Sequence, residues 1–436
     1  MAKENGKSEA TIAITRWEPV LVYPVEETGD EYFFLSNLDQ NIAVIMKTVH
    51  LFQANERRSS DDVGQVIKGA LAKLLVHFYP LAGSLTISSE GKLIVKCDGH
   101  GVPFVEAVAE CAMEVLGDIS TPDPEKLGKL VYTDPGAKSL LETPLLTVQV
   151  TRFRCGGFVV GLAMNHCMVD GLAAMGFLKS WAEIARGLPL STPPFLDRTI
   201  LRARQAPKPE FPHHEFDDIE DVSNLAQLYT SEPLQHRSFT FDAAKLGRLK
   251  QMAMEGDGPL ESYTSFTALT GLIWRARTRA LNMGPHQKTK LLFAVDGRAR
   301  LEPPLPVGFF GNGIILACCL CEAGELLDQP LSFAARLVQT AVRGTTDGFI
   351  RSAIDYYEVT RARPSLTATL LVTTWTQLGL SSLDFGWGEA VQTGLVDLPQ
   401  KEVALFIPVW KESKSTVVVL GLPAPCMEVF QELMDF

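Results

Sequence analysis

Apolar residues along the chain alternate between helix-like and strand-like spacing without any repeat period. This pattern predicts mixed α and β layers rather than a solenoid or a sandwich. Apolar side chains at three- and four-residue steps predict a helix over 61–77, with Ser60 as its candidate cap. Two short strands, 84–88 and 92–97, are predicted after it, on either side of a Glu-Gly turn.

A polar segment separates a buried strand from a helix near the middle of the first half. Residues 145–154 alternate apolar and polar side chains and 158–164 are almost wholly apolar, which predicts a hairpin with a buried second strand. Residues 165–171 (NHCMVDG) are polar and turn-like, and helical spacing resumes over 172–186. Because the two flanking elements would hold it rigidly, this segment is a candidate functional site.

Regular patterns stop between 188 and 233, where prolines recur and an acidic run follows at 215–221. This composition predicts a long crossover between two domains. Beyond it the pattern predicts a helix capped by Asp242, helical regions over 264–281 and 332–357, strands over 290–296, 314–321, 367–374, 403–408 and 416–421, and a C-terminal helix. We therefore expect two halves of comparable size, each mixing helices with strands.

Composition narrows the class of protein. The 436 residues are 46% hydrophobic and 21% charged, and the longest apolar run, 314–321, is far shorter than the roughly 20 residues of a bilayer span. The first sixteen residues are polar and charged, so no leader or anchor is expected. A net charge of -11 argues against a nucleic-acid partner, because it repels a phosphate backbone.

Cysteine usage indicates a reducing compartment. Most of the eight cysteines lie among apolar residues, so we interpret them as reduced, buried side chains of a cytoplasmic protein. Cys318 and Cys321 form a CxxC, but it lies inside a continuous apolar run and no second ligand pair follows at a suitable spacing. We therefore expect no metal site.

His166 and Asp170 are the first candidates for chemistry. An imidazole that leaves a buried strand can project into a cleft and accept a proton from a hydroxyl group. The spacing alone proves little, because His166 could instead cap the following helix and Asp170 could be its N-cap residue, with Gly171 as the first helical residue. Both interpretations stay open at this point.

Two further groups of residues could bind a ligand. Asp384–Gly388 (DFGWG), preceded by Thr373, Thr374 and Trp375, is an aromatic and glycine cluster that could simply pack its rings as a loop. Four cations, Lys288, Lys290, Arg298 and Arg300, surround one predicted strand. They could form a polyphosphate-binding site, or they could be solvent-exposed charges at the rim of the sheet.

These residues carry a resemblance to a known family. HCMVD at 166–170, followed by glycine, and DFGWG at 384–388 resemble the two signature motifs of the plant BAHD acyl-CoA-dependent acyltransferases. YPLAG at 79–83, VDGRAR at 295–300 and FFGN at 309–312 also look like family blocks, so the resemblance covers nearly the whole chain. The segments SNLDQNIAV (36–44), DYYEVTRARPSL (355–366) and FGWGEA most resemble the members that move feruloyl or caffeoyl units onto ω-hydroxy fatty acids and fatty alcohols.

The resemblance implies a chloramphenicol-acetyltransferase-like fold. Its two similar-sized domains each hold a mixed β-sheet with helices, and a channel runs between them. On this chain it implies an N-terminal domain over 1–187 that carries the HxxxD motif, a crossover loop over 188–233, and a C-terminal domain over 234–436 that carries DFGWG. A segment near 377–401 would return to the N-terminal domain.

The resemblance also implies roles for individual residues. His166 would be the general base, while the Trp375 indole and the Thr373 hydroxyl would stabilise the oxyanion, with Thr374 the less certain of the two threonines. Asp170, paired with Arg298, would be structural, as would Asp384, Gly386 and Trp387 of the DFGWG loop. Ser265, Lys288, Lys290 and Arg300 would contact CoA.

The function expected from the resemblance is transfer of a hydroxycinnamoyl group from CoA to the hydroxyl of an ω-hydroxy fatty acid or fatty alcohol. Acyl-CoA would be a co-substrate, no cofactor would be tightly bound, and the enzyme would be monomeric. One alternative is transfer to a polar acceptor such as shikimate, a phenolic lactate or a polyamine. Another is a catalytically silent binding module on the same fold.

Overall fold

The computed structural model describes residues 12–29, 31–255, 263–398, 402–409 and 412–436. Most of the N-terminal stretch in which we expected no leader lies outside the described residues, and the segment near 377–401 is described as far as residue 398. None of the helices in these ranges is long and apolar enough to cross a bilayer.

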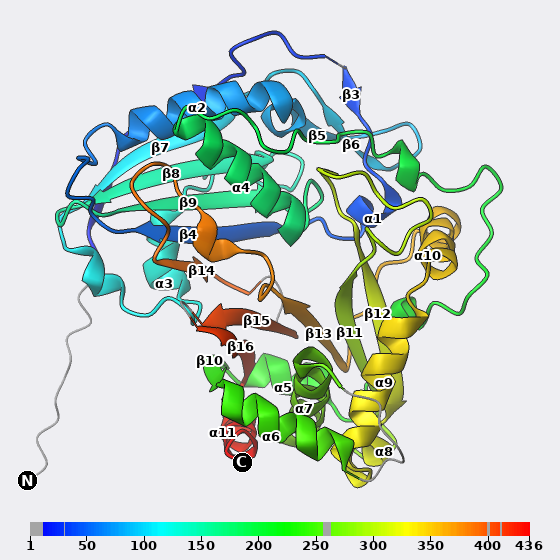
Figure 1. Cartoon of the computed structure of the whole chain (residues 1–436). Coiled ribbons are helices and arrows are strands. Elements are labelled where there is room, and N and C mark those ends of the chain that lie inside the picture. Colours follow the sequence, from blue (N-terminus) through cyan, green and yellow to red (C-terminus); the bar gives the residue numbers. More distant parts are fainter. Residues whose placement is uncertain (1–11, 30, 256–262, 399–401, 410–411) are drawn as a thin grey trace, which may run out of the picture.

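Two large sheets form the centres of two domains, which occupy the upper and lower halves of Figure 1. The first sheet has seven strands. In spatial order they are β1 (Ile14–Arg16), β7 (Val102–Ala109), β8 (Leu146–Phe153), β9 (Phe158–Asn165), β4 (Ile45–Phe52) and β14 (Gln392–Leu395), with β2 (Val20–Val22) also paired to β7. The fold is therefore mixed α and β, as the alternating pattern predicts.

The hairpin predicted at 145–164 is confirmed, because β8 and β9 pair antiparallel and β9 is buried throughout. The alternation of apolar and polar residues along the first strand does not mark exposed positions. The polar residues of β8, Thr147, Gln149 and Thr151, are as buried as its apolar ones. Two of them hydrogen-bond carbonyls of a covering loop: Thr147 Oγ1 to Tyr132 at 2.5 Å and Gln149 Nε2 to Lys129 at 3.0 Å.

Helices α2 (Val63–His77) and α4 (Gly171–Ala185) pack together over one face of the first sheet (Figure 1). Both were predicted from their periodicity. The expected cap of α2 is wrong: Asp62 is the N-cap residue and makes no side-chain cap bond, while Ser60 only accepts the Val63 N–H with its carbonyl at 3.2 Å. Asp170 does cap α4, accepting the Ala173 N–H at 3.0 Å.

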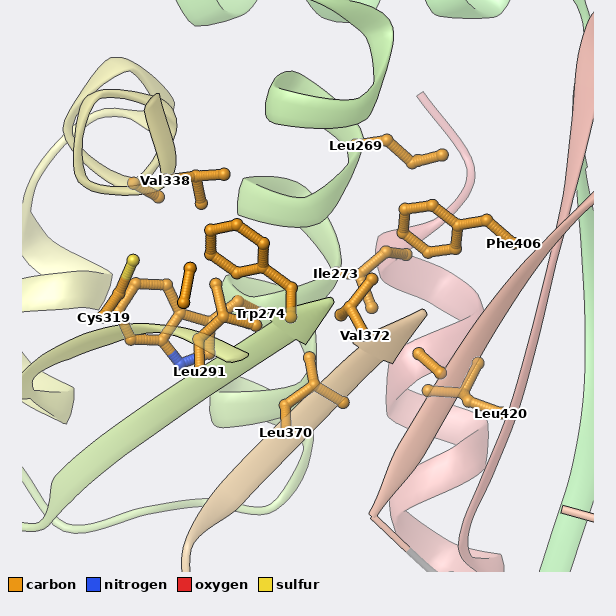
Figure 2. Close-up of a cluster of buried hydrophobic side chains, with 14 of the residues drawn as sticks. Leu269, Ile273, Trp274, Leu291, Cys319, Val338, Leu370, Val372, Phe406 and Leu420 are labelled. Carbon is orange, nitrogen blue, oxygen red and sulfur yellow. The ribbon is translucent and has the colours of Figure 1, made fainter. Parts of the chain in front are cut away.

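The second sheet has six strands and its own core. In spatial order they are β10 (Leu234–Phe241), β16 (Glu412–Pro423), β15 (Val403–Val409), β13 (Thr369–Thr374), β11 (Lys288–Asp296) and β12 (Ile314–Glu322). Figure 2 shows part of the core, where Ile273 and Trp274 of α7 (Ser265–Ala280) lie with Leu370 and Val372 of β13. The cysteine-rich run 314–321 is a strand, as predicted.

The helical region predicted over 332–357 is two helices, α9 (Leu331–Gly344) and α10 (Asp347–Thr360). The helical conformation is interrupted at Thr345 and Thr346, and Thr346 caps the second helix. Asp242 caps α6 as predicted. The remaining helices are α1 (Asn37–Gln40), α3 (Pro124–Leu127), α5 (Leu225–Ser231), α6 (Ala243–Met254), α8 (Ala323–Asp328) and α11 (Ala424–Leu433), and a small sheet holds β3 (Tyr32–Phe33), β6 (Leu93–Lys96) and β5 (Ser84–Ile87).

The segment between α4 and β10 is not wholly irregular, because it contains α5 and two short 3₁₀ turns, Thr199–Leu201 and His214–Phe216. After β13 the chain returns to the first sheet, where β14 pairs antiparallel with β4. Leu395 of β14 packs against Leu405 and Val419 of the second sheet, with Met46 and Trp375 at the edge of this cluster. The two sheets therefore share an apolar seam.

Candidate active site

His166 lies directly after β9, in the short turn that leads into α4. Its backbone N–H donates to the Val44 carbonyl at 2.8 Å, and Cys167 and Met168 after it are fully buried. The strand before it and the helix after it are both core elements, so the turn has little freedom to move. The ring of His166 is accordingly held at a defined place.

Asn312 determines which nitrogen of His166 carries the proton. The Asn312 Nδ2 group donates to Asp39 Oδ1 at 2.9 Å and to the His166 carbonyl at 2.8 Å, so its Oδ1 is the atom that faces His166 Nδ1, at 3.1 Å. An amide oxygen only accepts, and Nδ1 must therefore be the protonated nitrogen. Nε2 keeps a free lone pair and has no protein partner within the described part of the chain.

Burial keeps His166 in the form that can act as a base. Removal of water from around the ring lowers the pKa of His166 below its ordinary value, while Asp170, Asn312 and Asp39 act in the opposite direction. The loss of solvation dominates. At neutral pH the imidazole is therefore uncharged and its Nε2 can accept a proton.

His166 lines a narrow cavity of about 90 Å³. The cavity follows β9 and β4 from His166 to His50, which pairs with Val160, a span of roughly 20 Å at about 3.3 Å per residue. Its walls are mainly apolar, with Met46, Leu162, Met164, Val169, Ala174, Met175, Leu178, Leu378 and Leu380. Of the described residues that line it, none is lysine or arginine.

The far end of this cavity is polar but uncharged. His50 is buried, with Nδ1 3.0 Å from Thr393 Oγ1 and Nε2 3.3 Å from Thr48 Oγ1. Burial lowers the pKa of His50 to about 4, because no carboxylate compensates for the lost water. The cavity is thus lined by neutral groups from one end to the other, apart from Asp170 beside His166.

Asp170 is engaged away from His166. Its carboxylate accepts Arg298 Nη2 at 2.8 Å, the Gly313 N–H at 2.9 Å and the Ala173 N–H at 3.0 Å. A Cβ on Gly313 would lie 2.8 Å from Arg298 Nη1, so the absence of a side chain there lets the guanidinium approach. Asp170 therefore stabilises the turn, the start of α4 and the contact with the second domain, and it makes no hydrogen bond to the imidazole.

Trp375 lines the same cavity as His166 and follows β13 directly. Its backbone N–H donates to Phe406 at 2.7 Å. Thr373 is paired with Leu405 of the apolar seam between the sheets, whereas Thr374 is paired with Phe406 of the second core. Because paired residues of parallel strands face the same side, Thr373 points toward the seam and Thr374 away from it. Thr373 itself is not among the residues that line the cavity.

The DFGWG loop packs on the first domain and does not line the cavity. Phe385 is fully buried against Phe52 and Trp181, with ring centroids 5.7 and 5.3 Å apart. Asp384 Oδ1 accepts the N–H groups of Gly386 and Gly388, which both have φ above +100°. The Trp387 indole donates to Ser59 at 2.9 Å, and Arg58 lies 3.5 Å above its ring.

The four cations around β11 do not form one cluster, so the structure does not bring them together as a single phosphate site. Lys288 begins the strand and Asp296 ends it, so Lys288 lies roughly 26 Å along the strand from the end near His166. Lys290 is buried, and its Nζ donates to the Asp217 carbonyl at 2.7 Å. Arg300 binds the carbonyls of Val342 and Thr345 at the end of α9, at 2.8 and 2.9 Å.

Ser265 lies near the end of the second sheet at which Trp375 follows β13. It is the first residue of α7, and the next residue, Phe266, packs against Phe293 of β11 and Phe406 of β15. Phe406 in turn accepts the backbone N–H of Trp375. Ser265 and Trp375 therefore lie at the same end of the sheet.

Asn312 and Asp39 are site residues that the sequence did not identify. Both occur in segments recognised as family-like, FFGN and SNLDQNIAV, but nothing in either segment assigned a role to the amide or the carboxylate. Asn312 lies 146 residues from His166 in the chain. Only the approach of the two domains brings them together.

The two-domain fold places an uncharged imidazole in a mainly apolar cavity, an arrangement that suits proton abstraction from a hydroxyl group. The sequence model described as the Transferase family matches residues 12–436, and the chain belongs to that family, the BAHD acyltransferases. It is 59% identical to an ω-hydroxypalmitate O-feruloyl transferase of Arabidopsis thaliana (99% of this chain, 95% of that protein). It is 56% identical to a fatty alcohol:caffeoyl-CoA acyltransferase of the same plant (97% and 98%).

Solved structures agree with the fold. Vinorine synthase superposes with a TM-score of 0.75 at 24% identity, covering 96% of each chain. TRI101 of F. sporotrichioides, in complex with coenzyme A and T-2, superposes with a TM-score of 0.72 at 16% identity, covering 92% of this chain and 97% of that one. The protein is thus an acyltransferase with the two-domain fold of these enzymes.

Proposed function

We propose that the enzyme transfers a hydroxycinnamoyl group, such as feruloyl or caffeoyl, from CoA to the hydroxyl of an ω-hydroxy fatty acid or a fatty alcohol. The observation that carries the proposal is the His166 Nε2 lone pair at the end of a narrow cavity without lysine or arginine in its described lining. The names of the two Arabidopsis relatives supply the same donor and acceptor classes.

His166 acts as the general base in this proposal. Nε2 takes the proton from the acceptor hydroxyl while that oxygen attacks the thioester carbonyl, and the Nδ1–H bond to Asn312 keeps the ring oriented. The tetrahedral intermediate then collapses with cleavage of the carbon–sulfur bond, and the imidazolium returns the proton to the CoA thiolate. The ester and free CoA leave, and neither a metal nor a covalent enzyme intermediate is required.

Trp375 and Thr373 stabilise the oxyanion in this proposal. The Trp375 side chain lines the cavity with His166, and its indole nitrogen has no hydrogen-bond acceptor within the described part of the protein. Thr373 shares a face with Leu405 on the seam, which favours it over Thr374 as a second donor. A donor aimed at developing negative charge contributes about 10²- to 10³-fold to the rate.

Acyl-CoA is a co-substrate rather than a resident cofactor in this scheme. Of the CoA contacts expected from the sequence, Ser265 is the one retained, because the N-terminal end of a 16-residue helix attracts an anion. Its position at the Trp375 end of the second sheet supports a contact with CoA on the side of the sheet where the reaction takes place. We also retain the cytoplasmic location and the monomeric state as proposals.

A polar acceptor is the second candidate function, and the chemistry of the cavity wall argues against it. Shikimate and a phenolic lactate carry a carboxylate close to the reacting hydroxyl, unlike an ω-hydroxy fatty acid, and such an acceptor needs a cation near His166. Arg361 and Arg363, two cations of the segment 355–366, are not among the residues that line the cavity, and Arg361 pairs with Glu358 at 3.5 Å. Three methionines in the wall can instead adapt to an uncharged extended group.

The direct test is incubation of the purified enzyme with feruloyl-CoA and, separately, 16-hydroxypalmitate, hexadecanol, shikimate and spermidine. CoA release and the ester mass are measured together. We expect product with the two long-chain alcohols and far less with shikimate or spermidine. Product with shikimate alone would overturn the proposed acceptor class, and no product with any acceptor would favour a silent binding module.

A further inference from the structure

A buried carboxylate lies behind Asn312. Asp39 in α1 is fully buried, and its Oδ1 accepts both the side-chain and the backbone N–H of Asn312, at 2.9 and 3.0 Å. Its Oδ2 accepts the backbone N–H and the hydroxyl of Ser36, at 2.6 and 2.7 Å. Because a carboxylate only accepts, it fixes the Asn312 amide with nitrogen toward Asp39 and oxygen toward His166.

A buried arginine from the segment between the domains holds this carboxylate. Arg198 has a fully buried side chain, and its Nη1 lies 3.1 Å from Asp39 Oδ2. The same guanidinium donates to carbonyls on either side of the site, Nη2 to Met168 at 2.5 Å and Nε to Phe310 at 3.0 Å. The Arg198 guanidinium therefore hydrogen-bonds the segment that follows His166 and the segment that precedes Asn312.

We propose that Asp39 and Arg198 are positioning residues for the acyl transfer, acting through Asn312 to keep His166 in its Nδ1–H form with Nε2 free. The inference rests on the proposed role of His166 as the base and extends it to two charged residues that do not line the cavity. The connection runs from Arg198 to Asp39, from Asp39 to Asn312, and from Asn312 to His166 Nδ1.

The inference predicts a specific consequence of Asp39→Asn. An asparagine at 39 can present its amide nitrogen to Asn312, so that only the His166 carbonyl still favours the present orientation of the Asn312 amide. In the turned orientation the Asn312 nitrogen faces His166 Nδ1. The proton of His166 would then move to Nε2, and the nitrogen that faces the cavity could no longer accept one. The other charged residues around His166 are Asp170 and its partner Arg298, and this substitution leaves them unchanged.

The chain offers a matched control in the same segment. Arg204 also lies between the domains, and its Nε is 2.5 Å from Oδ2 of Asp355, a carboxylate with 1% exposure. Asp355 also accepts the backbone N–H groups of Arg204 and Lys208. This second pair has the same residue types, although the Arg204 side chain is 38% exposed, and its hydrogen bonds lead into α10 and not to His166.

The experiment compares Asp39→Asn with Asp355→Asn in the full-length enzyme, measuring kcat, KM for acyl-CoA, the pH profile of kcat/KM and the melting temperature. We expect Asp39→Asn to lower kcat roughly 10- to 100-fold with KM changed less than about twofold. Its acidic limb should move to lower pH, because the Asp39 charge raises the pKa of His166. Asp355→Asn should keep kcat within about twofold.

Equal effects of the two variants on kcat, or an unchanged pH profile in Asp39→Asn, would overturn the inference. If Asp39→Asn does not fold, Arg198→Lys and Arg204→Lys repeat the comparison, because lysine keeps the charge but cannot reach Asp39 and both carbonyls at once. Failure of the inference is distinguishable from failure of the proposed function. If His166→Ala remained active, the proposed role of His166 as the base would be wrong. If His166→Ala were inactive but Asp39→Asn had wild-type kinetics, only the positioning role of Asp39 and Arg198 would be wrong.

Discussion

His166 and Asp170 are four residues apart in the sequence, yet the structure gives them different chemistry. The imidazole faces the cavity with a free nitrogen, while the carboxylate binds Arg298 and two backbone N–H groups. His166→Ala should lower kcat about 10²- to 10⁴-fold with little change in melting temperature. A variant that retains substantial turnover would exclude His166 as the base.

Asp170→Ala should act on stability. The substitution removes the buried carboxylate partner of Arg298 and leaves it only the exposed Asp296, at 3.1 Å; breaking a buried ion pair costs roughly 3 to 5 kcal/mol of unfolding free energy. Denaturant unfolding of the two variants side by side measures the difference. If Asp170→Ala kept the wild-type stability but lost activity as His166→Ala does, the structural role of Asp170 would be wrong.

His50 makes the protein sensitive to acid. Its pKa is about 4 in the folded protein and near 6.5 in the unfolded chain, so the unfolded state binds more protons between these values. The effect of His50 on the unfolding free energy is therefore absent above about pH 6.5, and the unfolding free energy falls by about 3 kcal/mol as the pH drops toward 4. His50→Gln should flatten this part of the stability profile. An unchanged slope in the variant would show that other groups cause the acid sensitivity.

At the scale of elements, the DFGWG loop acts as a structural part of the first domain. Phe385 has no exposed surface and contacts two aromatic rings of that core, so Phe385→Ala should lower the unfolding free energy by about 3 to 5 kcal/mol. Phe211→Ala is the matched control, because Phe211 is 41% exposed. Equal stability of both variants would contradict this role.

Local periodicity predicted the elements around the site but not their interruptions. The strand ending at Asn165 and the helix after Asp170 follow from an apolar run and a three- and four-residue spacing. The break between α9 and α10 was missed, since helical apolar spacing continues on both sides of Thr345 and Thr346. The burial of Thr147 and Gln149 was missed because a loop from elsewhere in the chain covers them.

At the scale of the whole molecule, the arrangement around His166 depends on contacts between the two domains. The bond between His166 and Asn312 spans 146 residues and that between Arg298 and Asp170 spans 128; the family resemblance implied the second pair, whereas nothing in the sequence indicated the first. Cations near one strand suggested a single phosphate site, yet an extended strand separates the residues at its two ends. Sequence motifs therefore predicted the candidate base, while the groups that orient it required the tertiary fold.

The most direct test of the central claim is the rate of CoA release from feruloyl-CoA with 16-hydroxypalmitate or hexadecanol as acceptor, in wild-type enzyme and His166→Ala. The wild type should release CoA in step with ester formation, and the variant should lose about 10²- to 10⁴-fold of that rate. A His166→Ala enzyme that turns over at the wild-type rate, or a wild type that esterifies only shikimate, would contradict it.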